Sequence, residues 1–284
     1  MATFKDNNFV SSDALIRRQR GKSIIYVEGE SDKIIFEKFW FVEYLEKVSF
    51  ATVPKTQGCA AVVRQVGEDR QNGVQAFGIV DRDKLMADNH WALLRETDDL
   101  AFEAMRPYKD IKVTCRWELE SYLIDPVVIE AYVAVAEGGR TVRHVSTVED
   151  EFLEHANALI PLAALNQALH LHREAAVGDG FPAQDCRAQV EARIHSGKLA
   201  CHPNFKPDYD AAIPVVEAFG YTNSISSGNK MLGLLRILSG KAMLLRISKA
   251  FKIKDDIAYF LARDIKQSGR VPTELMRFIQ SCAS

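Results

Sequence analysis

The amino-acid sequence predicts an α/β fold: a mainly parallel sheet with flanking helices, plus an α-helical C-terminal domain. Short apolar runs alternate with helix-like segments up to about residue 137, which is typical of parallel strands joined by right-handed crossovers. Beyond residue 140 the pattern is helical and contains no strong strand signal. Acidic clusters directly follow two of the apolar runs, and open α/β sheets bind their ligands at that end of their strands.

Four strands are expected in the first half of the chain, at 23–27, 48–53, 75–80 and 111–115. Ser31 can cap the helix after the first strand, because a serine oxygen accepts a hydrogen bond from a backbone N–H of the first turn. Pro126 is expected in the first turn of a later helix, where proline is tolerated. The expected helices lie at about 31–46, 59–66 and 126–137, with a loop and a short helix over 84–108.

Three segments are predicted along the chain: an N-terminal arm or helix at 1–22, the α/β domain at 23–137, and a helical domain for partner or substrate binding at 138–284. The boundary is set at the glycine pair of Gly138–Arg140. Helices of the last segment are expected at about 147–176, 183–196, 208–219, 228–248, 254–267 and 272–281.

The composition is ordinary for a globular protein of 284 residues, with 47% hydrophobic and 26% charged residues. The formal net charge of −2 gives no overall attraction to nucleic acid, so any nucleic-acid surface must be local. No apolar run is long enough to span a bilayer, and the N-terminus lacks a signal-peptide core. The five scattered cysteines fit reduced thiols, so a cytoplasmic protein without a membrane partner is expected.

The acidic clusters are Glu28 with Asp32, and Asp81 with Asp83. Carboxylates at the ends of two parallel strands would converge at one edge of the sheet and repel each other unless a divalent cation lies among them. Oxygen ligands suit Mg²⁺ or Mn²⁺, and a metal site for phosphoryl chemistry is the favoured interpretation. The alternative is that these are solvated acids at strand ends.

Further site residues are expected downstream. Glu118 and Glu120 follow the fourth strand, and either can supply a ligand for a second metal ion. Their alternative role is to face solvent while the neighbouring apolar residues pack. Lys241 follows Gly240 at the start of an apolar helix and could reach a phosphate oxygen, whereas Lys230 is the weaker candidate. A solvated lysine after a turn is the alternative for both.

Basic residues gather near the end of the same apolar helix and beside the second acidic cluster. They are the candidates for contacts with a nucleic-acid backbone: Arg82, Arg246, Lys249, Lys252 and Lys254. The solvated face of an amphipathic helix is the alternative. Aromatic residues from Phe36 to Tyr44 exceed what one buried helix face needs, so they predict either a partner interface or packing inside the domain.

The run Tyr26–Lys33 together with Asp81–Asp83 resembles the Toprim domain of topoisomerases, bacterial primases and OLD-family nucleases. The resemblance gives the Toprim carboxylate roles to Glu28, Asp81 and Asp83. Asp32 matches the additional acid of the OLD type, Glu118 and Glu120 compete for its downstream glutamate, and Lys241 matches its distal lysine. Trp117–Leu123 and Ser239–Lys241 extend the similarity to the Toprim effector subunits of PARIS-type anti-phage systems. The turn at Thr56–Cys59 departs from the glycine–lysine pattern expected there.

The resemblance implies a metal-dependent nuclease with one or two Mg²⁺ or Mn²⁺ ions. It also implies an ABC-type ATPase partner that holds the nuclease, and release as an active homo-oligomer. The resulting hypothesis is a phosphodiesterase that cuts RNA, with tRNA among the candidates, or DNA. Glu28, Asp81, Asp83, Glu120 and Lys241 would be catalytic. The alternative is a non-catalytic signalling or binding subunit of an ATPase complex.

Overall fold

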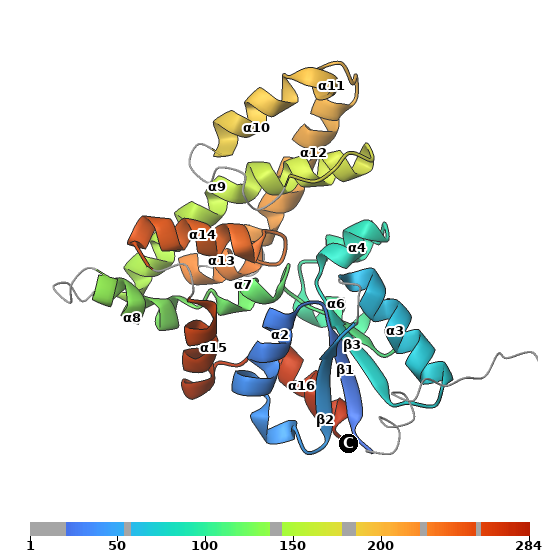
Figure 1. Cartoon of the computed structure of the whole chain (residues 1–284). Helices are drawn as coiled ribbons and strands as arrows, with labels where there is room; N and C mark the ends of the chain where they lie inside the picture. Colours follow the sequence, from blue (N-terminus) through green and yellow to red (C-terminus); the bar gives the residue numbers. More distant parts are fainter. Residues whose placement is uncertain (1–20, 54–57, 137–143, 178–185, 222–225, 254–256) are drawn as a thin grey trace, which may run out of the picture. The chain divides into compact units, whose positions relative to one another are not determined.

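The computed structural model describes residues 21–53, 58–136, 144–177, 186–221, 226–253 and 257–284, and Figure 1 shows their secondary structure. The described chain divides into two compact units. Unit 1 comprises the chain up to Val80 with Arg106–Val113 and Val271–Ser284, and unit 2 comprises Asp81–Met105 and Thr114–Arg270. The chain therefore passes between the two units more than once. The boundary expected at 138–140 and the arm expected at 1–22, except Gly21 and Lys22, lie outside the described residues.

Unit 1 is built on a four-stranded parallel sheet, which confirms the predicted α/β class. The strands are β1 (Ser23–Val27), β2 (Val48–Thr52), β3 (Ala76–Val80) and β4 (Ile111–Val113). Their order in the sheet is β2-β1-β3-β4, and every neighbouring pair is parallel. The connection from β1 leads to β2 on one side of β1, and the connection from β2 leads to β3 on the other side of β1. The strand order therefore reverses between β1 and β3, and such a switch point is where open α/β sheets bind ligands.

The two faces of the sheet are covered by different helices. Phe50, Ile25 and Phe77 are in register across β2, β1 and β3, and Phe77 contacts Phe278 of α16 (Thr273–Cys282) with ring centroids 6.2 Å apart. Gly78 faces the other way, towards α3 (Cys59–Gln71). A Cβ atom at Gly78 would lie 2.8 Å from Val62, so the close contact between β3 and α3 requires glycine.

The helix expected at 31–46 is broken into three pieces. They are α2 (Glu30–Ile35), the π-helical turn η1 (Phe36–Trp40) and the 3₁₀ turn η2 (Val42–Tyr44). The backbone N–H of Phe41 donates to the carbonyl of Phe36 at 3.0 Å, which inserts one residue into the turn. This insertion lets Phe36, Trp40 and Phe41 all point inward, each at most 1% exposed. Packing within unit 1 therefore accounts for these aromatic residues.

Unit 2 is helical among its described residues. It contains α4 (Asp83–Ala87), α5 (Trp91–Leu94), α6 (Asp99–Ala104), α7 (Leu119–Leu123), α8 (Pro126–Ala136), α9 (Val145–Leu171), α10 (Cys186–Ile194), α11 (Gly197–Ala200), α12 (Phe205–Tyr221), α13 (Ser227–Leu234), α14 (Gly240–Phe251) and α15 (Ala258–Gln267). The helix expected over 228–248 is in fact two helices, separated at Leu235–Ser239. Three short helices, α4, α5 and α6, lie in the region of residues 84–108, where a loop with one short helix was expected.

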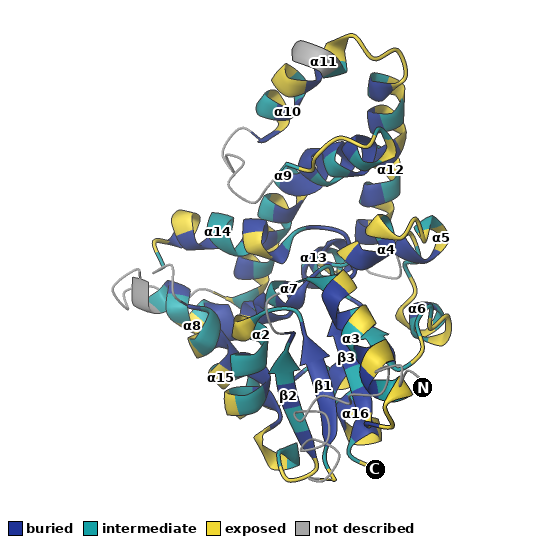
Figure 2. Cartoon of the chain, turned by 45° about the vertical axis from the view of Figure 1, so that its right-hand side comes forward, coloured by how far each residue is buried: buried dark blue, intermediate teal, exposed yellow. Residues whose placement is uncertain are grey.

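The core of unit 2 lies around α9, which packs against α10, α12, α13 and α14. Figure 2 shows buried residues along much of α9 and α12. Phe152 and Leu165 of α9 and Phe205 of α12 are completely buried. Within the described residues, none of the helices combines the length and the apolar character needed to cross a lipid bilayer.

Candidate functional site

In unit 1, the predicted site residues lie at the end of β1 and the start of α2. Glu28 follows the strand directly and is half-buried, and its Oε1 accepts a hydrogen bond from the Cys59 thiol at 2.8 Å. Asp32 lies in the first turn of α2, and its Oδ2 accepts a hydrogen bond from the backbone N–H of Gly29 at 3.0 Å. Gly29, not Ser31, is thus the N-cap residue of α2. The carboxylate of Asp32 also suits the positive end of the helix dipole.

In unit 2, backbone hydrogen bonds join the distant segments that carry the predicted site residues. The N–H of Arg82 donates to the carbonyl of Trp117, and the N–H of Trp117 donates to the carbonyl of Leu235, both at 2.9 Å. Leu235 lies just after α13, and a carbonyl at a helix end has no partner within its own helix. The break between α13 and α14 therefore links the segment of Asp81 to those of Glu118 and Lys241.

Arg82 is a structural residue, and the expectation that it contacts nucleic acid is wrong. It is 0% exposed, and its guanidinium donates to the carbonyls of Cys115 at 2.7 Å, Leu94 at 3.0 Å and Glu96 at 2.5 Å. The guanidinium also lies over the ring of Phe102, with 4.1 Å between its central carbon and the ring centroid. Burial lowers the pKa of Arg82 to about 10, so the side chain is still protonated at neutral pH.

Asp81 and Asp83 flank Arg82 but are more accessible. Asp81 is half-buried, while Asp83 is exposed at the first residue of α4. Arg82 is the N-cap residue of α4, so its burial holds the start of this helix in the interior of unit 2. Buried Arg82 thereby fixes the backbone that carries both carboxylates.

Glu118 holds the start of α14. Its Oε1 accepts hydrogen bonds from the Ser239 hydroxyl at 2.9 Å and from the backbone N–H of Lys241 at 2.8 Å. Its Oε2 accepts a third from Nζ of Lys241 at 2.9 Å. The side chain of Glu118 is only 9% exposed, so these bonds are shielded from water. Both oxygens are engaged with α14, which favours a role for Glu118 in positioning Lys241 over metal ligation.

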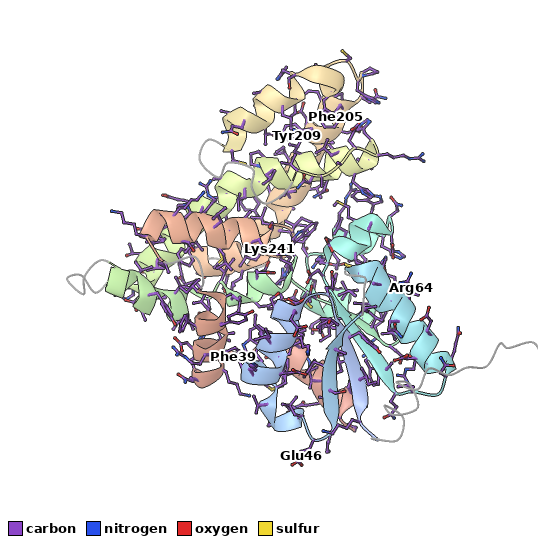
Figure 3. The ribbon with its side chains drawn as sticks, in the orientation of Figure 1. Phe39, Glu46, Arg64, Phe205, Tyr209 and Lys241 are labelled. Atoms are coloured by element: carbon purple, nitrogen blue, oxygen red, sulfur yellow. The ribbon has the colours of Figure 1, made fainter. Side chains whose placement is uncertain are left out.

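Lys241 is the cation of this cluster and is labelled in Figure 3 at the start of α14. Its Nζ lies 3.8 Å from a carboxylate oxygen of Glu120. Burial by itself would lower the pKa of Lys241. The charges of Glu118, Glu120 and Asp81, with the hydrogen bond from Glu118, outweigh that effect and hold the pKa well above its usual range. Lys241 therefore stays protonated and positively charged at neutral pH.

Glu120 is the more accessible of the two downstream glutamates. It lies in the first turn of α7, and its side chain is 21% exposed. Lys230, the other lysine considered, lies on α13 and is not among the contacts of Glu118. Glu118, Glu120 and Lys241 thus lie close together, and the negative charge of Asp81 also acts on Lys241.

Substitution of Gly240 by alanine is expected to destabilise the protein by about 1–3 kcal/mol. A Cβ atom there would lie 2.3 Å from the backbone nitrogen of Ser121, which forces α14 away from α7. Urea unfolding measures the change in the free energy of unfolding. The matched control is Gly67→Ala on α3, where no atom lies within 4 Å of the added Cβ, and a gain of about 0.5–1 kcal/mol is expected. Wild-type stability of Gly240→Ala would contradict the tight contact.

The predicted basic surface on α14 is only partly present. Lys249 and Lys252 are exposed at the end of the helix, and their contact with nucleic acid remains a prediction. Arg246 is half-buried, and its Nε and Nη1 are shielded from solvent and have no hydrogen-bond partner among the described residues. Those two nitrogens are not offered to a nucleic-acid backbone, and contact through the remaining nitrogen, Nη2, stays a prediction. Lys254 lies outside the described residues.

Three contributions to the site were not expected from the sequence: the Cys59 thiol on Glu28, the Ser239 hydroxyl on Glu118, and the interior position of Arg82. Ser239 carries a usable signal, because serine directly before a helix is a frequent N-cap residue, and its hydroxyl also accepts from the N–H of Ala242 at 3.1 Å. Comparison with protein-family models and with curated protein sequences finds no match for this chain.

Proposed function

We propose that the chain is a metal-dependent phosphodiesterase that hydrolyses RNA, with tRNA among the candidates, or DNA. The observation that carries this proposal is that acidic residues directly follow β1 and β3, which are parallel neighbours at the switch point of the sheet. Ligands of open α/β sheets bind outside the carboxyl ends of the strands at such a point. Carboxylate oxygens at that edge are the donors that Mg²⁺ and Mn²⁺ prefer.

In this proposal the metal ligands are Glu28, Asp32, Asp81 and Asp83, with Glu120 available for a second ion. When bound, the ion would supply Lewis acidity and a coordinated water of lowered pKa. Lys241 would stabilise negative charge on the phosphate, because its pKa is raised and it keeps its proton. Glu118 would serve as a positioning residue that fixes the ammonium group of Lys241.

The biological setting is proposed from the sequence resemblance alone. An ABC-type ATPase would hold the nuclease in an anti-phage defence system, and the released protein would act as a homo-oligomer. An ATPase gene beside the gene for this chain would support that setting. The non-catalytic alternative is less favoured, because three of the five aromatic residues that suggested a partner surface, Phe36, Trp40 and Phe41, are buried within unit 1, while Phe39 and Tyr44 are half-buried.

Removal of divalent metal is expected to abolish cleavage of nucleic acid by the purified protein. The assay follows end-labelled single-stranded RNA, tRNA and duplex DNA with Mg²⁺, with Mn²⁺, or with excess EDTA. Cleavage should stop in EDTA and return when the metal is restored, because in the proposed reaction the metal ion stabilises the negative charge of the transition state. Absence of cleavage of every substrate with both metals, alone and with the ATPase, would overturn the proposed activity.

A further inference from the structure

A separate cavity lies wholly within unit 2, between α9, α10, α12 and α13. Its volume is about 240 Å³, and it shares no lining residue with the cluster around Lys241. The lining includes three buried apolar residues, Ile160, Leu234 and Gly220. Small-molecule sites combine apolar lining residues with a few polar groups that fix the orientation of the ligand.

The polar groups of this cavity carry both signs of charge. Arg187 of α10 and Lys230 of α13 supply two cations, while Glu217 of α12 supplies a carboxylate. Within the part of the chain that the structure describes, none of these three side chains forms an ion pair. By contrast, Lys206 on the same α12 pairs with Asp210 at 2.5 Å. Charged groups that line a cavity and make no ion pair with one another are suited to pairing with a ligand.

The rim adds an aromatic ring and an amide. Tyr221, at the end of α12, lines the cavity and is 72% exposed. Asn157 of α9 is also exposed and offers both a donor and an acceptor. Aromatic side chains bind nucleobases by stacking with little dependence on base identity.

We propose that this cavity binds a ribonucleoside monophosphate unit. Lys230 and Arg187 would bind the phosphate through charge-assisted hydrogen bonds. Glu217 would accept hydrogen bonds from the ribose hydroxyls, as acidic residues do in nucleotide sites. Tyr221 would stack on the base, with Asn157 at the base edge. The ligand is either a free nucleotide or a nucleotide within an RNA strand, and both present the same groups.

Calorimetric titration of the full-length protein with AMP, GMP, CMP and UMP tests this site. At least one should bind saturably, with the matching deoxynucleotide and the phosphate-free nucleoside each weaker by about tenfold or more. Lys230→Met should weaken ribonucleotide binding by about 10- to 100-fold. Glu217→Gln should weaken the ribonucleotide by about tenfold and leave the deoxynucleotide unchanged, which a general loss of folding would not do.

The control variants carry the same Lys→Met or Arg→Met substitution at positions outside the cavity. Lys206→Met on α12 and Arg193→Met on α10 lie outside the cavity and should bind as the wild type does. If Lys230→Met does not fold, Arg187→Met replaces it, because Arg187 is exposed. Competition by a short single-stranded RNA would identify a nucleotide within a strand, and its absence a free nucleotide.

Failure of all four nucleotides to bind at millimolar concentration would overturn the inference. So would binding that is equally strong in Lys230→Met, Arg187→Met and Glu217→Gln. The inference does not rest on the proposed phosphodiesterase activity, because the measurement is of binding and requires neither metal nor cleavage.

Discussion

Replacement of Glu28 by glutamine is expected to lower metal-dependent cleavage by about a thousandfold while leaving the stability of the protein nearly unchanged. The neutral amide binds a divalent ion far more weakly than a carboxylate does. Loss of about 4 kcal/mol of metal-derived stabilisation corresponds to that factor. The glutamine oxygen can still accept the hydrogen bond of the Cys59 thiol, and the residue is only half-buried. Cleavage rates and urea unfolding together measure both effects.

Glu30→Gln is the matched control for this substitution. Glu30 lies two residues away, is exposed, and pairs with Lys33 at 3.1 Å. Exposed ion pairs contribute between about 0 and 1 kcal/mol, so activity and stability should both be close to those of the wild type. Wild-type activity in both variants would show that Glu28 is not part of the site. The same large loss of activity in both variants would show that the total negative charge at the end of β1 matters, and that Glu28 is not needed as an individual ligand.

Replacement of Arg82 by leucine is expected to prevent cooperative folding of unit 2. The carbonyls of Cys115, Leu94 and Glu96 would lose their donor in the interior, and each buried unpaired group costs about 1–3 kcal/mol. Their sum is comparable with the whole stability of a domain, about 5–15 kcal/mol. Soluble yield and urea unfolding followed by tryptophan fluorescence measure the loss.

Two further arginine variants make this result interpretable. Arg82→Lys keeps the positive charge but cannot reach several carbonyls with one ammonium group, so it should be strongly destabilised as well. Arg95→Met removes an exposed guanidinium that lies 5.4 Å from the centroid of the Trp91 ring, and a loss below about 1 kcal/mol is expected. An Arg82→Leu protein as stable as Arg95→Met would show that the buried hydrogen bonds contribute little.

The parallel sheet could be predicted because its strands are short apolar runs separated by helix-length segments. The helices were harder to delimit. The apolar stretch Met231–Leu238 continues across the break after α13, so the hydrophobic pattern alone indicates one helix over 228–248. The break is defined by a tertiary hydrogen bond from Trp117 to Leu235, which no local pattern reports.

The candidate site was predictable as a set of residues but not as an arrangement. Glu118 and Lys241 are 123 positions apart, and only the resemblance to a known family connected them. Arg82 was predicted to be accessible to nucleic acid, because a basic residue between two acidic residues after a strand is typical of a turn exposed to solvent. The structure shows it completely buried. Its burial depends on Phe102 and Phe219, whose rings come from distant parts of unit 2. Such a partner set has no sequence signature of its own.

The alternation of the two units along the chain has a mechanical consequence. The chain leaves unit 1 after Val80, returns at Arg106, leaves again after Val113 and returns at Val271. Unit 2 is therefore inserted into unit 1 as two loops, and the C-terminal α16 belongs to the same unit as β1. A force applied between β1 and α16 is borne first by the contacts of α16 with the sheet, such as that of Phe278 with Phe77. Unit 2 comes under tension once those contacts have yielded.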